Sequence, residues 1–139
     1  SEDLGIVLSS AKIFLISGFN CIQETNTLVR RISDIKRHMI HFSKDGIVFF
    51  EDAGYHVPSL SKLVRDELVP LLDIYSMNEE ELYSYIGNRM DLLNPSEMQR
   101  VFSEIYEMIP AKVLVIHTKF WAVAIGFVAQ FFLNLKKNL

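Results

Sequence analysis

Four short apolar runs, separated by stretches with helical spacing, constrain the fold of this chain more than any other feature. They are KIFLIS at 12–17, IVFF at 47–50, DIYS at 73–76 and VLVI at 113–116. Each is too short for a helix, and IVFF and VLVI are rich in β-forming residues. An uninterrupted apolar run is typical of a strand buried on both faces, so we expect IVFF to be covered on both sides.

The stretches between these runs have the periodicity of amphipathic helices. One helix is expected around the apolar positions 28, 29, 32, 35 and 39, and another over 61–72 with its inner stripe at 63, 64, 68, 71 and 72. Pro70 should shorten or distort the end of the second helix. Further helices are expected over 79–86, with Asn78 as N-cap, and from Pro95 to about Met108, with Asn94 as N-cap.

Strands that alternate with helices predict an α/β fold with a parallel sheet and right-handed crossovers. Residues 121–125 are a candidate fifth strand, and residues 127–138 are expected to form a terminal helix. The chain has 139 residues, which suits a single domain, and half of them are hydrophobic, which suits a packed core.

Charge and cysteine content exclude several classes of protein. The chain carries 14 basic and 17 acidic side chains, a formal net charge of −3, which argues against a nucleic-acid binder with a basic face. Its single cysteine, Cys21, excludes an internal disulfide and a multi-cysteine metal site, and favours a reducing, cytoplasmic location. Cys21 has no evident cationic neighbour, so we expect it to be inert.

An uncharged run of 16 residues, 120–135, lies between Lys119 and Lys136. A transmembrane helix needs roughly 20 apolar residues, so a buried strand followed by a buried helix is the better interpretation. This surface could instead pack against polypeptide outside the chain or support self-association. No signal-peptide pattern is present. Ser1 and the absence of Met before Met39 suggest a processed chain or one that begins within a larger reading frame.

Polar residues follow each of the four apolar runs. Because the carboxyl ends of parallel strands meet at one edge of the sheet, where ligands bind, these residues are candidates for a common site. They are Ser17 and Gly18, Glu51, Asn78 with Glu81, and His117 with Thr118. Glu51 and Glu81 could give hard oxygen ligands to Mg²⁺, which takes one or two carboxylates and bridges phosphates.

Each of these residues also has a purely structural interpretation. Glu51 can be a solvated acid at a strand end, and Asn78 with Glu81 can be ordinary helix-capping chemistry. Ser17-Gly18 can form a tight turn, and His117 can be hydrogen-bonded locally. The residue pattern alone leaves these alternatives open.

The same segments resemble motifs of the ADP-dependent sugar kinases, a ribokinase-like family that includes archaeal glucokinases and phosphofructokinases. FLISGFN at 14–20 resembles its LSG[FL]Q strand, VFFEDA at 48–53 its HxEfA strand end, YSMNEEEL at 75–82 its NExEL segment, and VLVIHTKFWA at 113–122 its IHxHT segment. The four segments occur in family order.

The resemblance implies a three-layer, parallel-sheet α/β fold and a role for each matched residue. Glu51, Asn78 and Glu81 would serve Mg²⁺, and Ser17, Gly18, His117 and Thr118 would face the sugar or nucleotide. It further implies transfer of the β-phosphoryl group of ADP to glucose or fructose 6-phosphate in glycolysis, in the cytoplasm.

The chain departs from the family pattern at two places. Phe49 stands where the HxE motif has His, and no Gly-x-Gly-Asp sequence, which holds the family's catalytic base, is present. The family's lid lobe is not represented either. We therefore expect residues 1–139 to be one partial large domain that is inactive alone and that pairs with the remainder of a kinase. The alternative is a non-catalytic α/β module that binds a nucleotide or a partner.

Overall fold

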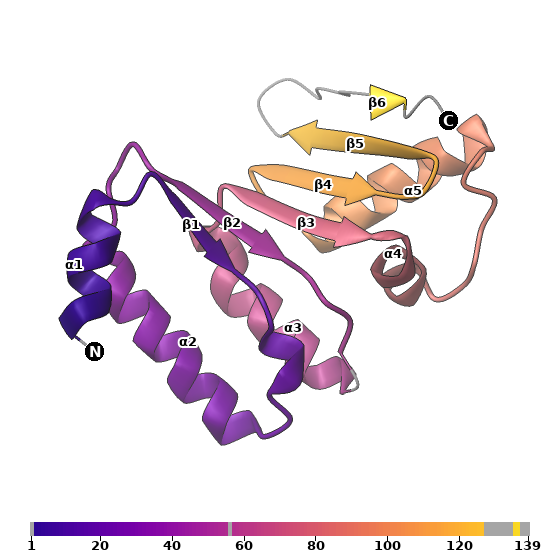
Figure 1. Cartoon of the computed structure of the whole chain (residues 1–139). Coiled ribbons are helices and arrows are strands. Elements are labelled where there is room, and N and C mark those ends of the chain that lie inside the picture. Colours follow the sequence, from indigo (N-terminus) through magenta and orange to yellow (C-terminus); the bar gives the residue numbers. More distant parts are fainter. Residues whose placement is uncertain (1, 56, 127–134, 137–139) are drawn as a thin grey trace.

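The computed structural model describes residues 2–55, 57–126 and 135–136, which form a six-stranded sheet with helices (Figure 1). The strands are β1 (Ile13–Ile16), β2 (Ile47–Glu51), β3 (Ile74–Asn78), β4 (Val113–His117), β5 (Trp121–Gly126) and β6 (Leu135–Lys136). The helices are α1 (Glu2–Ser10), α2 (Thr25–Met39), α3 (Pro58–Leu68), α4 (Glu79–Ile86) and α5 (Pro95–Met108), with short 3₁₀ turns η1 (Phe19–Cys21) and η2 (Val69–Leu71).

The predicted strand–helix alternation is confirmed. All four apolar runs form strands, and the expected helices appear as α2, α3, α4 and α5. Pro70 lies in η2, so the helix ends early, as expected. Leu71 is an exception, because it is exposed rather than part of the inner stripe. Helix α1 was not predicted.

The sheet is parallel from β1 to β4, and its strands lie side by side in sequence order. Strand β5 is antiparallel to β4, because only three residues join the two strands and a parallel connection needs a crossover. The expected terminal helix is wrong at Leu135–Lys136, which pair with β5 as a strand. The rest of that prediction, at 127–134 and 137–138, lies outside the described residues.

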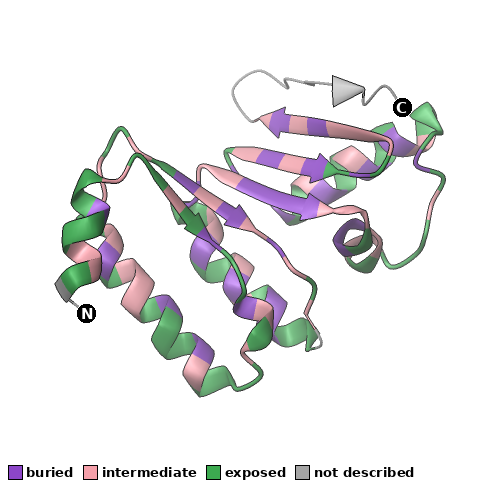
Figure 2. Cartoon of the chain, in the orientation of Figure 1, coloured by how far each residue is buried: buried purple, intermediate pink, exposed green. Residues whose placement is uncertain are grey.

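The core lies between the helices and one face of the sheet. Side chains at alternate strand positions, among them Phe50, Tyr75 and Leu114, are buried against the inner stripes of α2, α3 and α5. The expectation that IVFF is buried on both faces is wrong, because Val48 and Phe50 are buried whereas Ile47 is exposed (Figure 2). The described residues therefore form two layers, a sheet and the helices on one of its faces, and not the three layers that the motif resemblance implies.

No helix in the described ranges is long and apolar enough to span a membrane. The indole nitrogen of Trp121 in β5 donates a hydrogen bond of 2.7 Å to the carbonyl of Leu92, just before α5. This bond ties the antiparallel end of the sheet to the helical layer, so β5 belongs to the same packed unit.

Candidate functional site

The candidate site begins with the helix that follows β3. The side-chain oxygen of Asn78 accepts hydrogen bonds from the backbone nitrogens of Glu80 at 2.8 Å and Glu81 at 3.0 Å. The Glu81 carboxylate in turn accepts from the Asn78 nitrogen at 2.6 Å, which completes a capping box. The capping chemistry predicted for Asn78 is thus present, and it fixes the direction of the Glu81 side chain.

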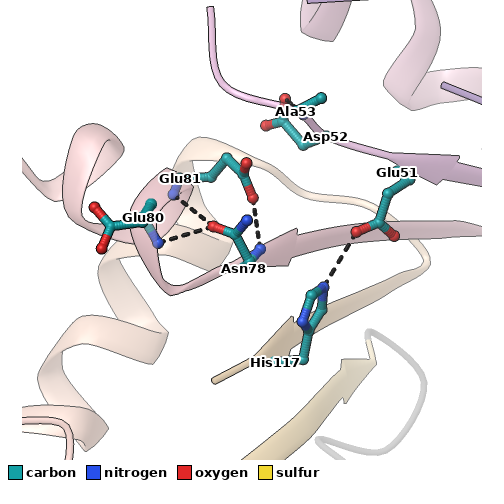
Figure 3. A network of polar contacts seen from close by, with 7 residues as sticks. All are labelled: Glu51, Asp52, Ala53, Asn78, Glu80, Glu81 and His117. Carbon is teal, nitrogen blue, oxygen red and sulfur yellow. Dashed lines mark hydrogen bonds and ion pairs between the residues drawn. The ribbon is translucent and has the colours of Figure 1, made fainter. Parts of the chain in front are cut away.

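Glu51 and His117 meet on the face of the sheet opposite the core, at the ends of β2 and β4. Oε1 of Glu51 lies 3.1 Å from Nε2 of His117, and the two side chains are 35% and 46% exposed. Strand β3 lies between them, and the register places Glu51 beside Ser76 and His117 beside Asn78. Figure 3 shows Glu51, Asn78 and His117 at the carboxyl ends of the three strands, with Glu81 in the first turn of α4 beside Asn78.

The surroundings of Glu81 disfavour the charged form of its carboxyl. Burial raises the pKa of its carboxyl above the usual value, and the charges of Asp52 and Glu51 act in the same direction. The hydrogen bond from Asn78 and the charge of His117 act in the opposite direction but do not cancel the rise. A cation beside Glu81 would favour the charged form of this carboxyl.

Two carboxylate oxygens remain for a cation. In the described contacts, Oε2 of Glu51 and Oε1 of Glu81 take no hydrogen bond, and Oε1 of Glu81 lies toward Gly54. Over the same residues, no cluster of three or more His, Cys, Asp or Glu side chains is arranged to enclose a metal. This donor set fits a hydrated Mg²⁺ held by one or two acids, and does not form an all-protein cage.

The structure does not bring every predicted residue to this place. Ser17 and Gly18 follow β1, two strands from Glu81, and line a separate hollow of about 340 Å³ between β1 and α2. Gly18 has φ of 79°, a left-handed conformation that suits glycine and opens the turn into η1. The hydroxyl of Thr118 is buried, accepts from the nitrogens of Phe120 and Trp121 at 3.0 Å, and donates to the Trp121 carbonyl.

A buried polar network next to Glu51 was not predicted. Asp52 is 3% exposed, and its carboxylate accepts hydrogen bonds from the Tyr75 hydroxyl at 2.7 Å, the Tyr85 hydroxyl and the Ala53 nitrogen. Burial, followed by the charge of Asp52, raises the pKa of Tyr75 and raises that of Tyr85 to about 12. The alternation of side chains along a strand could have indicated this position, because Asp52 lies two residues after Phe50 and therefore faces the same helix-covered side of the sheet.

A second hollow of about 510 Å³ lies on the helical side of Glu81, between α3 and α4. Tyr85, Arg65 and Glu81 contribute to its wall, and the Arg65 guanidinium lies 4.7 Å from the centre of the Tyr85 ring. Glu81 therefore stands between this hollow and the Glu51–His117 pair.

Comparison with known proteins shows what this arrangement is similar to. No protein-family model and no curated protein matches the sequence. Among solved structures, a hypothetical ADP-dependent phosphofructokinase from Pyrococcus horikoshii OT3 matches with a TM-score of 0.71 and 18% identity over 92% of this chain and 32% of that one. An ADP-dependent kinase in complex with fructose-6-phosphate and ADPbetaS matches with a TM-score of 0.70 and 13% identity over 88% of this chain and 31% of that one.

Ribokinase from Giardia lamblia matches with a TM-score of 0.68 and 18% identity over 97% of this chain and 39% of that one. The chain thus has the α/β fold of ribokinase-like kinases, as the motif resemblance implied, and it spans less than half the length of each of these proteins. At this level of identity the likeness concerns the fold alone.

Proposed function

We propose that residues 1–139 are one partial large domain of a Mg²⁺-dependent sugar kinase that transfers the β-phosphoryl group of ADP to glucose or fructose 6-phosphate. The observation that supports the proposal is the presence of Glu51 at the end of β2 and Glu81 in the first turn of α4, directly after the neighbouring strand β3, each with one carboxylate oxygen that makes no hydrogen bond in the described contacts. The names of the similar solved structures support ADP and a sugar phosphate as substrates. The proposal includes a cytoplasmic location, which the single cysteine supports.

Phosphoryl transfer asks the protein mainly for positioning and for charge neutralisation around the phosphates. Mg²⁺, when bound, supplies that neutralisation. Glu51 and Glu81 would hold the hydrated ion, with Glu51 oriented by His117 and Glu81 by the Asn78 capping box. In the same proposal Ser17, Gly18 and His117 would contact the sugar or nucleotide, and Thr118 would contribute through the β4–β5 turn that its hydroxyl holds.

Calorimetric titration with Mg²⁺ and ADP tests these assignments. We expect Glu51→Gln and Glu81→Gln each to weaken binding about tenfold, which is ~1.4 kcal/mol. Glu80→Gln is the matched control, because Glu80 is exposed, pairs with Arg89 and should leave affinity within about twofold. Equal affinity in all four proteins, or binding that does not depend on Mg²⁺, would remove the metal assignment.

Turnover gives a second test. The chain contains no Gly-x-Gly-Asp sequence and no acidic residue after Glu107. In this proposal it therefore supplies ligands for the metal but no residue assigned as the catalytic base. We expect the isolated 139 residues to show no appreciable ADP-dependent sugar phosphorylation. Robust turnover by this polypeptide alone would contradict the proposal.

The same lack of an assigned base favours a second candidate function, a non-catalytic module that binds a nucleotide or a partner protein. Sequencing the reading frame on both sides of this segment distinguishes the two candidates. A downstream Gly-x-Gly-Asp and an upstream lid domain support the kinase, whereas stop codons at both ends support the module.

A further inference from the structure

The guanidinium of Arg65, in the hollow between α3 and α4, has no acidic partner in the described contacts. Its Nε atom donates to the Ser61 carbonyl, one turn earlier in α3, at 3.4 Å, and its central carbon lies 4.7 Å from the centre of the Tyr85 ring. The two terminal nitrogens make no hydrogen bond or ion pair with the described residues. Three other arginines each pair with a carboxylate on the surface, namely Arg37, Arg89 and Arg100.

The position of this cation is both half-buried and fixed. The Ser61 carbonyl and the Tyr85 ring hold the guanidinium from two sides, so its orientation is set before any ligand arrives. A guanidinium makes its strongest contacts as two parallel hydrogen bonds to one carboxylate or phosphate. Because no acid among the described residues makes these bonds, the free end of Arg65 indicates an anion from outside the chain.

The hollow that Arg65 lines has the size of a small-molecule site. Its volume is about 510 Å³, within the roughly 300–1,000 Å³ that is typical of ligand pockets. Pro58 and Met108 give its wall apolar surface, and Tyr55 and Ser84 add hydroxyl groups. Neither hydroxyl takes part in a described hydrogen bond. Burial raises the pKa of Tyr55, so its phenol keeps its proton and can donate.

The acids in the same wall limit the charge of a ligand. Glu80 and Glu81 both line the hollow, and Glu80 pairs with Arg89 at 3.0 Å. A dianion such as a phosphate monoester would be repelled by both carboxyl groups. A carboxylate carries a single negative charge and still matches the two terminal nitrogens of Arg65, so it fits this wall better.

We propose that the hollow between α3 and α4 binds a small organic monocarboxylate with an apolar or aromatic body, whose carboxylate pairs with the terminal nitrogens of Arg65. The apolar part of the wall would contact the body of the ligand, and Tyr55 offers a second donor. The hollow lies on the other side of Glu81 from the Glu51–His117 pair. The proposal therefore goes beyond the phosphotransferase and does not depend on Mg²⁺ or ADP.

Fluorine NMR titration with para-fluorobenzoate, in the protein made from the whole reading frame, tests the proposal. We expect the probe to bind with a Kd of about 1 mM or lower, and Arg65→Gln to weaken binding at least about tenfold. Arg65→Lys keeps the charge but not the planar pair of donors, so it should recover only part of the affinity. Arg100→Gln is the matched control, because Arg100 is exposed, pairs with Glu104 and should leave affinity within about twofold.

A second ligand and a second variant complete the test. The neutral analogue para-fluorobenzamide should bind at least about tenfold more weakly than the benzoate, because it lacks the charge that pairs with Arg65. Ser84→Leu, at an exposed position in the wall, should weaken benzoate binding about threefold or more by narrowing the hollow, and it replaces Arg65→Gln if that variant does not fold. No benzoate binding at about 10 mM, equal affinity in wild type and Arg65→Gln, or equal affinity for acid and amide would each overturn the proposal.

Discussion

Asp52 shows how a single buried side chain can connect three parts of the structure. Its carboxylate follows β2 and receives hydroxyl hydrogen bonds from Tyr75 in β3 and Tyr85 in α4. A buried carboxylate is stable only with such donors, because desolvation of the charge costs several kcal/mol otherwise. Asp52, the residue after Glu51, thus joins the end of β2 to β3 and α4.

Replacing Asp52 should therefore be costly. Asp52→Ala removes the acceptor shared by two phenols, and we expect a loss of about 3 kcal/mol in the free energy of unfolding. Urea unfolding followed by circular dichroism measures it. Asp66→Ala is the control, because in the described contacts Asp66 forms an exposed ion pair with Lys62, and its loss should change stability by less than about 0.5 kcal/mol. Similar unfolding midpoints for the two variants would show that the network contributes little.

The raised pKa of Tyr85 predicts a change of stability at alkaline pH. The unfolded phenol releases its proton near 10.0, whereas burial and the Asp52 charge hold the folded one to about 12. The folded state then binds the extra proton, so its stability falls as pH rises from 10 to 12. We expect the stability advantage of the wild type over Tyr85→Phe to be complete below pH 10 and to shrink across this range. A constant difference between the two proteins would contradict this assignment.

At the scale of elements, the turn into β2 depends on a close approach. A Cβ placed on Gly46 would lie 2.4 Å from the ring of Phe42, a distance no real contact has. The centre of the Phe42 ring lies 6.1 Å from the centre of the Phe14 ring in β1, so a shift of Phe42 would disturb this aromatic contact. Glycine is required here by the space available.

The expected result is that Gly46→Ala destabilises the protein by about 1 to 3 kcal/mol through overpacking. Thermal unfolding measures the change. Gly126→Ala is the matched control, because among the described residues its new Cβ would meet only the Lys112 carbonyl, at 3.6 Å, an ordinary contact. Adding Phe42→Leu to Gly46→Ala should recover part of the loss, and no recovery would place the strain elsewhere.

At the scale of the molecule, the sheet has a protected centre and a vulnerable edge. Strands β3 and β4 have neighbours on both sides and carry fully buried side chains such as Met77 and Leu114. Strand β1 is an edge strand in the described sheet, and two of its four side chains are largely exposed. Local opening should therefore cost least at β1.

Hydrogen exchange of the 139-residue chain tests this gradient. We expect the amides of β3 and β4 to exchange slowest, and those of β1 to exchange at least about tenfold faster, because edge strands open at lower free energy. Amides of β1 as protected as those of β4 in the isolated chain would contradict the gradient.

Sequence alone determined the class of fold and most of its elements, although it missed α1 and assigned a helix at Leu135–Lys136. Helix caps at Asn78 and Asn94, the early helix end at Pro70 and the four apolar runs are all local signals, and each acts within a few residues. Local signals of this kind specify where helices and strands form, and their alternation is enough to specify an α/β fold with the residues of the candidate site at strand ends.

Only the tertiary structure decided which of those residues meet. Glu51 and His117 are 66 positions apart, and the Asp52 network joins residues separated by up to 33 positions. Such contacts depend on strand order and register, which local periodicity does not encode. The apolar run IVFF suggested a strand covered on both faces, because a local pattern does not show on which side of the sheet the helices lie. The helices lie on one face of the sheet because four parallel strands are added in one direction with right-handed crossovers, which is a property of the whole sheet.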